Sequence, residues 1–420
     1  MAGASERRGE PAHHGKVMKW LGKVFERESG KLNWPRAIMT LDVLLVPLVI
    51  FAAIGHEQYL FSAVFGVLFA ELSDPGGSYW QRASRIFIFG AVGAGLTALG
   101  FGIGGGAWGW LVLAAFAVTL AAGLALTFGV HRFVSAYLLS IWFIISLAIA
   151  FSFHHHTHIT QYTWAQVVAW SGGAVLWIVI AFIVWLIRGR HDSAPPIVEM
   201  PGDTSRRKLT PPLITFAVLR ALVMAGTVAI AFGAAGSLHG YWMAIAAIVA
   251  MKPTLEQSTL MGAQRVAGAL IGGIAAALLL LIPANVHGLN LLVLDSGLGV
   301  VAVVLLIHGV GIRFWNYALY YSAISAGVLL LLDLGQPTDY AAEGYRLLWA
   351  FCGVAIAVVV MFLAGLLAKR RPAKTPPQPA SATVPDSAVK PAIVPEQGGD
   401  RHDQHAGLGG RGRPRRSPRT

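Results

Sequence analysis

The sequence predicts an all-α polytopic membrane protein of about twelve transmembrane helices, arranged as two parallel six-helix repeats. Three observations predict this class: a low charge content, recurring apolar segments of membrane-spanning length, and basic residues confined to alternate loops. Of the 420 residues, 12% are charged and 55% are hydrophobic, and the mean hydropathy is +0.62. A soluble domain usually carries about 25% charged residues, so this chain lacks the polar surface that water requires.

Apolar runs separated by short polar, Gly or Pro breaks predict six spans in each half of the chain. The first six are expected near 37–55, 59–72, 86–104, 108–129, 133–151 and 165–187. The second six are expected near 213–236, 241–252, 264–283, 293–309, 314–333 and 346–368. The second span of each half is short for a full crossing.

These spans divide the chain into five segments. An amphipathic, basic N-terminal segment, 1–35, precedes the first membrane repeat, 36–187, and a Pro-rich linker, 188–212, precedes the second repeat, 213–368. The C-terminal segment, 369–420, is rich in Pro, Ala, Ser and Gly and ends in a run of arginines. Its apolar content is too low for a packed core, so we expect a disordered basic tail in the cytoplasm.

The distribution of basic residues predicts the orientation. Of the 32 Lys and Arg residues, 31 fall in loops or span ends on one side, and only Arg346 falls on the other. By the positive-inside rule, both termini are cytoplasmic in a multi-pass protein of the cell (inner or plasma) membrane. The net charge of +12 therefore reflects orientation in the lipid bilayer, and no nucleic-acid partner is expected.

The two halves match at anchor positions with nearly constant spacing. The matched pairs, offset by 180 to 184 residues, are Arg36/Arg220, Tyr59/Tyr241, Arg85/Arg265, Arg132/Arg313 and Arg188/Lys369. Because each half begins and ends on the same side, the repeats are parallel and a shared central pathway is expected.

The second half carries a recognisable string of residues: Tyr241-Trp242, then Lys252-Pro253-Thr254, then Gln264-Arg265 before Gly268. Here the sequence resembles the fusaric-acid-resistance-like (FUSC) family, which includes bacterial aromatic carboxylic acid exporters. In the first half, Ser73-Asp74-Pro75-Gly76-Gly77 followed by Arg85 looks like the corresponding element.

The resemblance covers about 36–369 and implies a secondary transporter that exports small organic anions such as aromatic carboxylates. It also implies a homodimer. Many family members carry sizeable cytoplasmic domains after their membrane blocks, whereas this chain has only the linker and the tail. Functions that reside in those domains, such as docking a periplasmic adaptor, are therefore not implied for this chain.

Several side chains are candidates for an anion path, because arginines attract carboxylates and polar aromatic side chains can line a route for them. These candidates are Arg85, Arg132, Arg265, Arg313, Tyr241, Asn316 and Tyr320. Positive-inside topology alone also explains the arginines, and hydrogen bonding between helices also explains the other polar residues. Asp42, about 1.5 turns beyond Arg36, is a candidate for proton coupling or for a pair with that arginine.

No enzyme, cofactor or metal is expected. The sequence holds no nucleophile elbow, Walker loop or Rossmann glycine pattern in a credible context. His154, His155, His156 and His158 could sense pH or bind a metal, but a tolerated polar loop is the preferred interpretation.

Two other functions remain open. A major-facilitator carrier also has twelve spans in parallel halves, and the loop Asp74–Arg85 loosely imitates its cytoplasmic loop. A membrane scaffold or envelope-assembly protein would use the basic tail and an amphipathic N-terminal helix as its interaction surfaces.

Overall fold

A computed structural model describes residues 22–26, 34–74, 78–187, 208–234, 239–252, 255–280, 289–313, 315–333 and 340–370. Every regular element within these residues is helical, so the predicted all-helical class is confirmed for them. The N-terminal segment, the linker and the C-terminal tail predicted from the sequence lie mostly outside these residues.

The first half of the described chain contains the helices α2 Trp34–Ile54, α3 Leu60–Ser73, α4 Tyr79–Ile103, α5 Trp108–Leu124, α6 Val130–Ser152 and α7 Thr163–Ile187. The second half contains α8 Pro211–Val228, α9 Tyr241–Ala250, α10 Leu255–Leu280, α11 Leu289–Ile312, α12 Tyr317–Asp333 and α13 Tyr340–Arg370. Short 3-10 or π segments extend α5, α6 and α8.

Seven segments in the described part of the chain are long and apolar enough to cross a membrane. They are Tyr79–Ile103, Trp108–Phe128, Val130–His155, Thr163–Ile187, Pro211–Ala234, Ser258–Leu279 and Gly344–Leu367. The other five predicted spans overlap shorter apolar stretches, which are Ala37–Phe51, Leu60–Ser73, Tyr241–Ala250, Leu298–Ile312 and Tyr317–Leu330. Helix α3 has only 14 residues in all and α9 only 10. A ten-residue helix rises about 15 Å, half of a bilayer core of about 30 Å.

Two helices begin at least seven residues earlier than the apolar pattern indicates. The third span is predicted to begin at residue 86 and the ninth at 264, whereas α4 begins at Tyr79 and α10 at Leu255. Their first turns are polar and therefore escape a hydropathy criterion. As a result Arg85 and Arg265 lie within helices rather than at the loop ends where the sequence places them.

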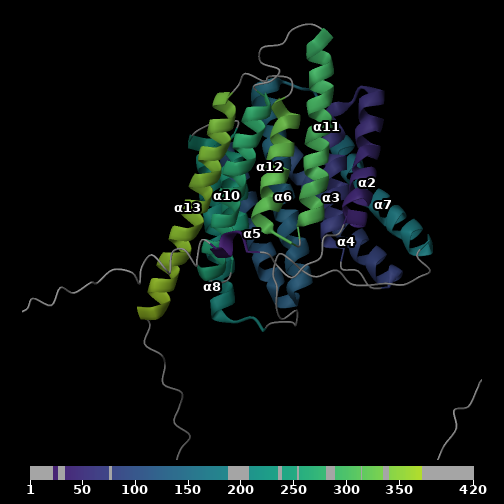
Figure 1. Cartoon of the computed structure of the whole chain (residues 1–420). Coiled ribbons are helices and arrows are strands. Elements are labelled where there is room, and N and C mark those ends of the chain that lie inside the picture. The colour runs from purple at the N-terminus through teal and green to yellow at the C-terminus, as the bar shows by residue number, and fades with distance from the viewer. Residues whose placement is uncertain are drawn as a thin grey trace, which may run out of the picture. The chain divides into compact units, whose positions relative to one another are not determined.

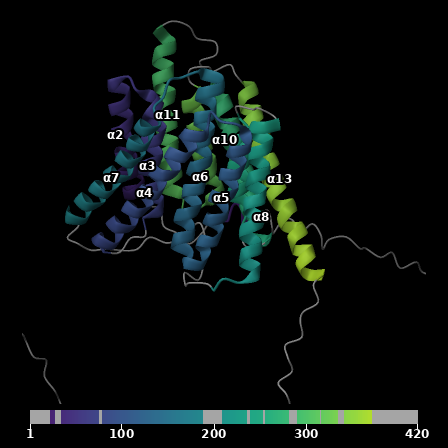
Figure 2. The same ribbon diagram turned by 180° about the vertical axis from the view of Figure 1, so that it is seen from behind.

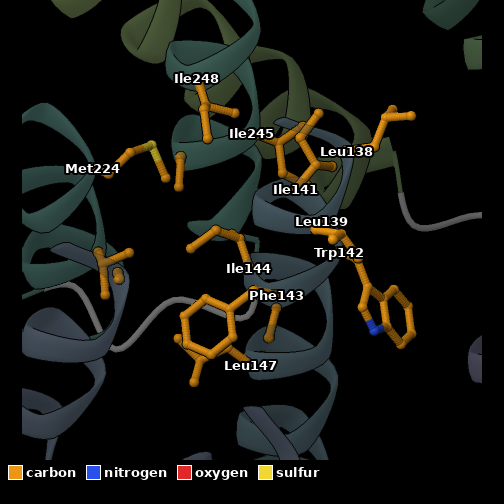
Figure 3. Packing of buried hydrophobic residues seen from close by; sticks show 14 of the residues in the cluster. Leu138, Leu139, Ile141, Trp142, Phe143, Ile144, Leu147, Met224, Ile245 and Ile248 are labelled. Atoms are coloured by element: carbon orange, nitrogen blue, oxygen red, sulfur yellow. The ribbon is translucent and has the colours of Figure 1, made fainter. Parts of the chain in front are cut away.

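Helix α6 occupies the centre of the bundle, between α4 and α5 (Figure 2). Its span is 72% buried, whereas the other six candidate spans are between 28% and 50% buried. Figure 3 shows Ile141 and Ile144 of α6 packed near Met224 of α8 and Ile248 of α9. Trp142 points to another side of α6.

Within each half, the helices at the same positions in the chain order contact one another. The first half pairs α2 with α3, α3 with α7, α4 with α7, α4 with α6, and α5 with α6. The second half pairs α8 with α9, α9 with α13, α10 with α13, α10 with α12, and α11 with α12. Between the halves, α5 packs on α8 and α11 packs on α2, the latter pair being visible in Figure 1.

One glycine contact occurs at the same place in both halves. Gly173 of α7 lies against the carbonyl of Ala63 in α3, and Gly353 of α13 lies against the carbonyl of Met243 in α9. Both members of the second pair follow those of the first by 180 residues. Glycine permits this approach because any Cβ would collide with the neighbouring backbone, which cannot rotate away.

Candidate functional site

Three basic side chains are buried where α8, α10 and the end of α9 meet. Arg220 is 0% exposed, Lys252 6% and Arg265 5%. The charges of Arg220 and Arg265 both act on Lys252. We call these three residues the cationic centre. Burying like charges together is costly, so such an arrangement in a membrane protein points to a role beyond packing.

Aromatic rings surround the cationic centre. The Cζ atom of Arg220 lies 5.2 Å from the ring centre of Tyr137, and Nζ of Lys252 lies 5.0 Å from the same ring. The Cζ atom of Arg265 lies 4.4 Å from the ring centre of Tyr321. The negative faces of these rings offset part of the cost of desolvating the cations.

The two arginines retain hydrogen-bonding capacity. Nε and Nη1 of Arg220 have no hydrogen-bond partner, and neither has Nε of Arg265. Nη2 of Arg220 makes one long bond, 3.4 Å, to the carbonyl oxygen of Ile248. The second ring over Arg220, that of Phe133 at 5.3 Å, offers no acceptor atom. These donors therefore remain available to a carboxylate.

Two buried carboxylates lie at the end of α3. Glu71 is 2% exposed and its charge acts on Tyr320 of α12. Asp74 accepts two hydrogen bonds from Arg82, Nε at 3.0 Å and Nη2 at 2.6 Å, and a longer one from Trp177. The bidentate pair neutralises Asp74 locally.

The structure brings together three of the residues predicted from the sequence. Arg265 belongs to the cationic centre, and its charge acts on Tyr320. Arg313 is 8% exposed, and its Cζ lies 6.0 Å from the Tyr320 ring. These residues come from α10, α12 and the turn between α11 and α12, which are distant in sequence but adjacent in the bundle.

Asn316, also predicted for the anion path, contacts the N-terminal segment 22–26. Its Nδ2 donates to the carbonyl of Phe25 at 2.9 Å, and its Oδ1 accepts from the backbone N–H of Leu319 at 3.0 Å. The amide of Gln264 donates to the carbonyl of Val24 at 3.4 Å. The N-terminal segment is thus attached beside Arg265.

The other predicted residues lie elsewhere. Arg85 on α4, Arg132 on α6 and Asp42 on α2 are exposed. Tyr241 is half-buried at the start of α9, with its ring 5.4 Å from that of Trp242. Because Arg85, Arg132 and Asp42 are exposed, they do not belong to the buried cationic centre.

Arg220 and Lys252 belong to the cationic centre but were not among the candidates. The distribution of basic residues between the two sides of the membrane predicted that both lie at the cytoplasmic ends of spans. Arg220 nevertheless interrupts the apolar run of α8, nine residues after its first residue, Pro211, with no acidic residue in that helix. An arginine without an acidic neighbour inside an apolar helix was the sequence feature that could have identified Arg220 as a candidate.

Two members of the histidine cluster noted in the sequence, His154 and His155, are described by the structure as neighbours. His154 and His155 are exposed and pack edge-on, with ring centres 4.8 Å apart. No group of three or more potential metal ligands occurs among the residues that could be searched.

Among the described residues, seven helices are long and apolar enough to cross a membrane, which indicates a multi-pass α-helical membrane protein. Residues 221–360 match the family described as fusaric acid resistance protein-like. The match begins beside Arg220, includes Lys252 and Arg265, and confirms the predicted family resemblance over the second half of the membrane region. Comparisons with curated proteins and with solved structures gave no match.

Proposed function

We propose that this protein is a secondary transporter that exports small organic anions, such as aromatic carboxylates, across the cell membrane. The family match is consistent with a transporter-type role. The observation that carries the substrate class is the cationic centre, in which two buried arginines keep guanidinium nitrogens without hydrogen-bond partners.

A carboxylate bound at the cationic centre would supply both the missing hydrogen-bond acceptors and a compensating negative charge. It would accept hydrogen bonds from Arg220 and Arg265, and its charge would reduce the repulsion within the centre. Such bonds are strong where water is excluded. The rings of Tyr137 and Tyr321, which pack on these cations, would lie beside the bound carboxylate.

We also propose that residues 36–187 and 213–368 are parallel repeats. The equivalent helix pairs and the glycine contacts offset by 180 residues support this arrangement. Tyr137 would then come from the first repeat and Arg220 from the second, which puts the centre at a repeat interface, where transporters commonly bind substrate. The short helices α3 and α9 end near buried Glu71 and Lys252, as interrupted transporter helices end near charged sites.

The remaining parts of the proposal concern coupling and assembly. Both termini would be cytoplasmic, export would be proton-coupled and the protein would form a homodimer. Asp42 is the carboxylate predicted for coupling, and buried Glu71 is a second candidate because its charge acts on Tyr320. Measuring efflux with and without a proton gradient in Asp42→Asn and Glu71→Gln separates the two. Efflux that ignores the gradient in the wild type would remove coupling from the proposal.

The central test is electrophysiology on liposomes containing purified protein, adsorbed on a solid-supported membrane. Benzoate-type anions and dicarboxylates are compared for wild type, Arg265→Gln and Arg220→Gln. The control is Lys208→Gln, which removes an exposed cation three residues before α8. Currents specific to one anion class should fall about tenfold or more in the two arginine variants, because each removes a charge-assisted hydrogen bond. No current with any anion, from folded and inserted protein, would favour a membrane scaffold instead.

The exposed arginines of the predicted path should behave differently. Arg85→Gln and Arg132→Gln remove charges that water screens. If these residues guide anions toward the centre, their loss weakens currents at low salt, and the effect disappears as the salt concentration rises. An effect that is independent of salt would instead place them at the binding site.

A further inference from the structure

An apolar pocket lies between α10 and α13 and reaches Arg265. Its volume is about 400 Å³, within the range of small-molecule sites in proteins. Apart from Arg265, its lining is apolar and includes Leu270, Leu348 and Phe351.

The two ends of the pocket differ in character. Leu270 is 41% exposed, Leu348 54% and Phe351 57%. Exposed apolar side chains on membrane-spanning helices face the lipid, so this end opens toward the hydrocarbon of the bilayer. Arg265, in contrast, is 5% exposed, with its Nε lacking a hydrogen-bond partner.

We propose that this pocket binds the apolar body of an amphipathic organic anion that enters from the bilayer, with its carboxylate at Arg265. The proposal rests on the proposed transport function and specifies the substrate class and its route of entry. A compact anion would leave the apolar pocket unfilled, and an uncharged acyl chain would gain nothing from the guanidinium. A monoanion with an apolar body satisfies both ends.

Entry from the bilayer follows from the chemistry of such a ligand. An amphipathic carboxylate partitions into the membrane with its head at the interface and its apolar part among the lipid chains. The bilayer therefore concentrates it beside the open end of the pocket. Arg265, with Tyr321 stacked 4.4 Å from its Cζ, would then receive the head.

Two glycines of α13 provide a matched pair of variants. Gly344 lines the pocket and Gly365 does not, and an added Cβ meets no atom within 4 Å at either position. Gly344→Trp would therefore occupy the mouth of the pocket without displacing backbone. Gly365→Trp places the same side chain on the same helix away from it.

The test is photo-crosslinking in phosphatidylcholine nanodiscs, independent of transport. The probe is a medium-chain carboxylate with a diazirine at its apolar end, and mass spectrometry locates the labelled peptides. We expect labelling of α10 and α13, lowered about tenfold in Arg265→Gln because a charge-assisted hydrogen bond is lost. Labelling should also fall in Gly344→Trp and persist in Gly365→Trp.

The outcomes separate this proposal from the proposed function. Equal labelling by the methyl ester of the probe would show that the pocket merely accommodates acyl chains, and would overturn the proposal. Labelling that survives both Arg265→Gln and Gly344→Trp would overturn it too, even if benzoate currents are normal. If labelling depends on the carboxylate but the protein transports no anion, the proposed binding site is supported and the proposed transport function is rejected.

Discussion

Replacing Arg220 with methionine tests whether this buried arginine is kept for function at the expense of stability. Methionine is long, flexible and apolar, so it can fill most of the space of the arginine side chain. We expect Arg220→Met to be more stable than the wild type and to lose transport. A purely structural arginine would give the opposite result, a less stable protein.

The magnitude follows from the contacts of Arg220. Two of its nitrogens have no partner, and an unsatisfied buried donor costs about 1–3 kcal/mol, so removing both gains about 2–6 kcal/mol. The lost interactions with the rings of Phe133 and Tyr137 are worth about 0.5–2 kcal/mol each. The long hydrogen bond to Ile248 adds little. The central values, a gain of about 4 kcal/mol and a loss of about 2.5 kcal/mol, favour methionine by about 1.5 kcal/mol.

The chain provides its own reporter for this measurement. Its one cysteine, Cys352, is half-buried in α13, which packs against α8. A thiol-reactive dye therefore becomes fluorescent as the protein unfolds and exposes this side chain. Melting in detergent should occur at a higher temperature in Arg220→Met than in the wild type.

The matched control is Lys208→Met, which removes an exposed cation close to the start of α8. A change at such a surface position should alter stability by no more than about 0.5 kcal/mol. Anion currents should drop to background in Arg220→Met and persist in Lys208→Met. A destabilised Arg220→Met that still transports would refute the reasoning, because the arginine would then be structural.

Three further predictions concern packing and local attachment. Gly173→Ala and Gly353→Ala should each destabilise the protein by about 1–3 kcal/mol, measured by the same thermal assay, because the new Cβ meets a helix carbonyl; equal stability would mean that the helices separate without cost. Asp74→Asn weakens a part-buried bidentate pair and should cost about 1–3 kcal/mol. Unchanged melting would show that the pair contributes nothing to stability. Asn316→Ala removes a hydrogen bond to segment 22–26, so trypsin should cleave that segment faster than in the wild type; unchanged cleavage would show that other contacts attach it.

The apolar pattern of the sequence predicted the helices well, whereas the residue motifs predicted only part of the candidate site. Every predicted span overlaps a helix among the described residues, because burial in lipid requires uninterrupted apolar runs. The starts of α4 and α10 were misplaced, since a helix can continue through polar turns that hydropathy does not detect. Arg265 was identified through its motif, whereas Arg220 carried no motif and was assigned to a loop end.

The sequence by itself determined the helical class, the order of the apolar segments and the family resemblance of the second half. These properties depend on composition and spacing, which are local. Only the tertiary structure decided that Arg220, Lys252 and Arg265 share one buried centre with Tyr137, and that Arg85 and Arg132 are exposed. The physical reason is rotation: hydropathy shows that a segment is a helix, but the packing of neighbouring helices sets which of its faces turns inward.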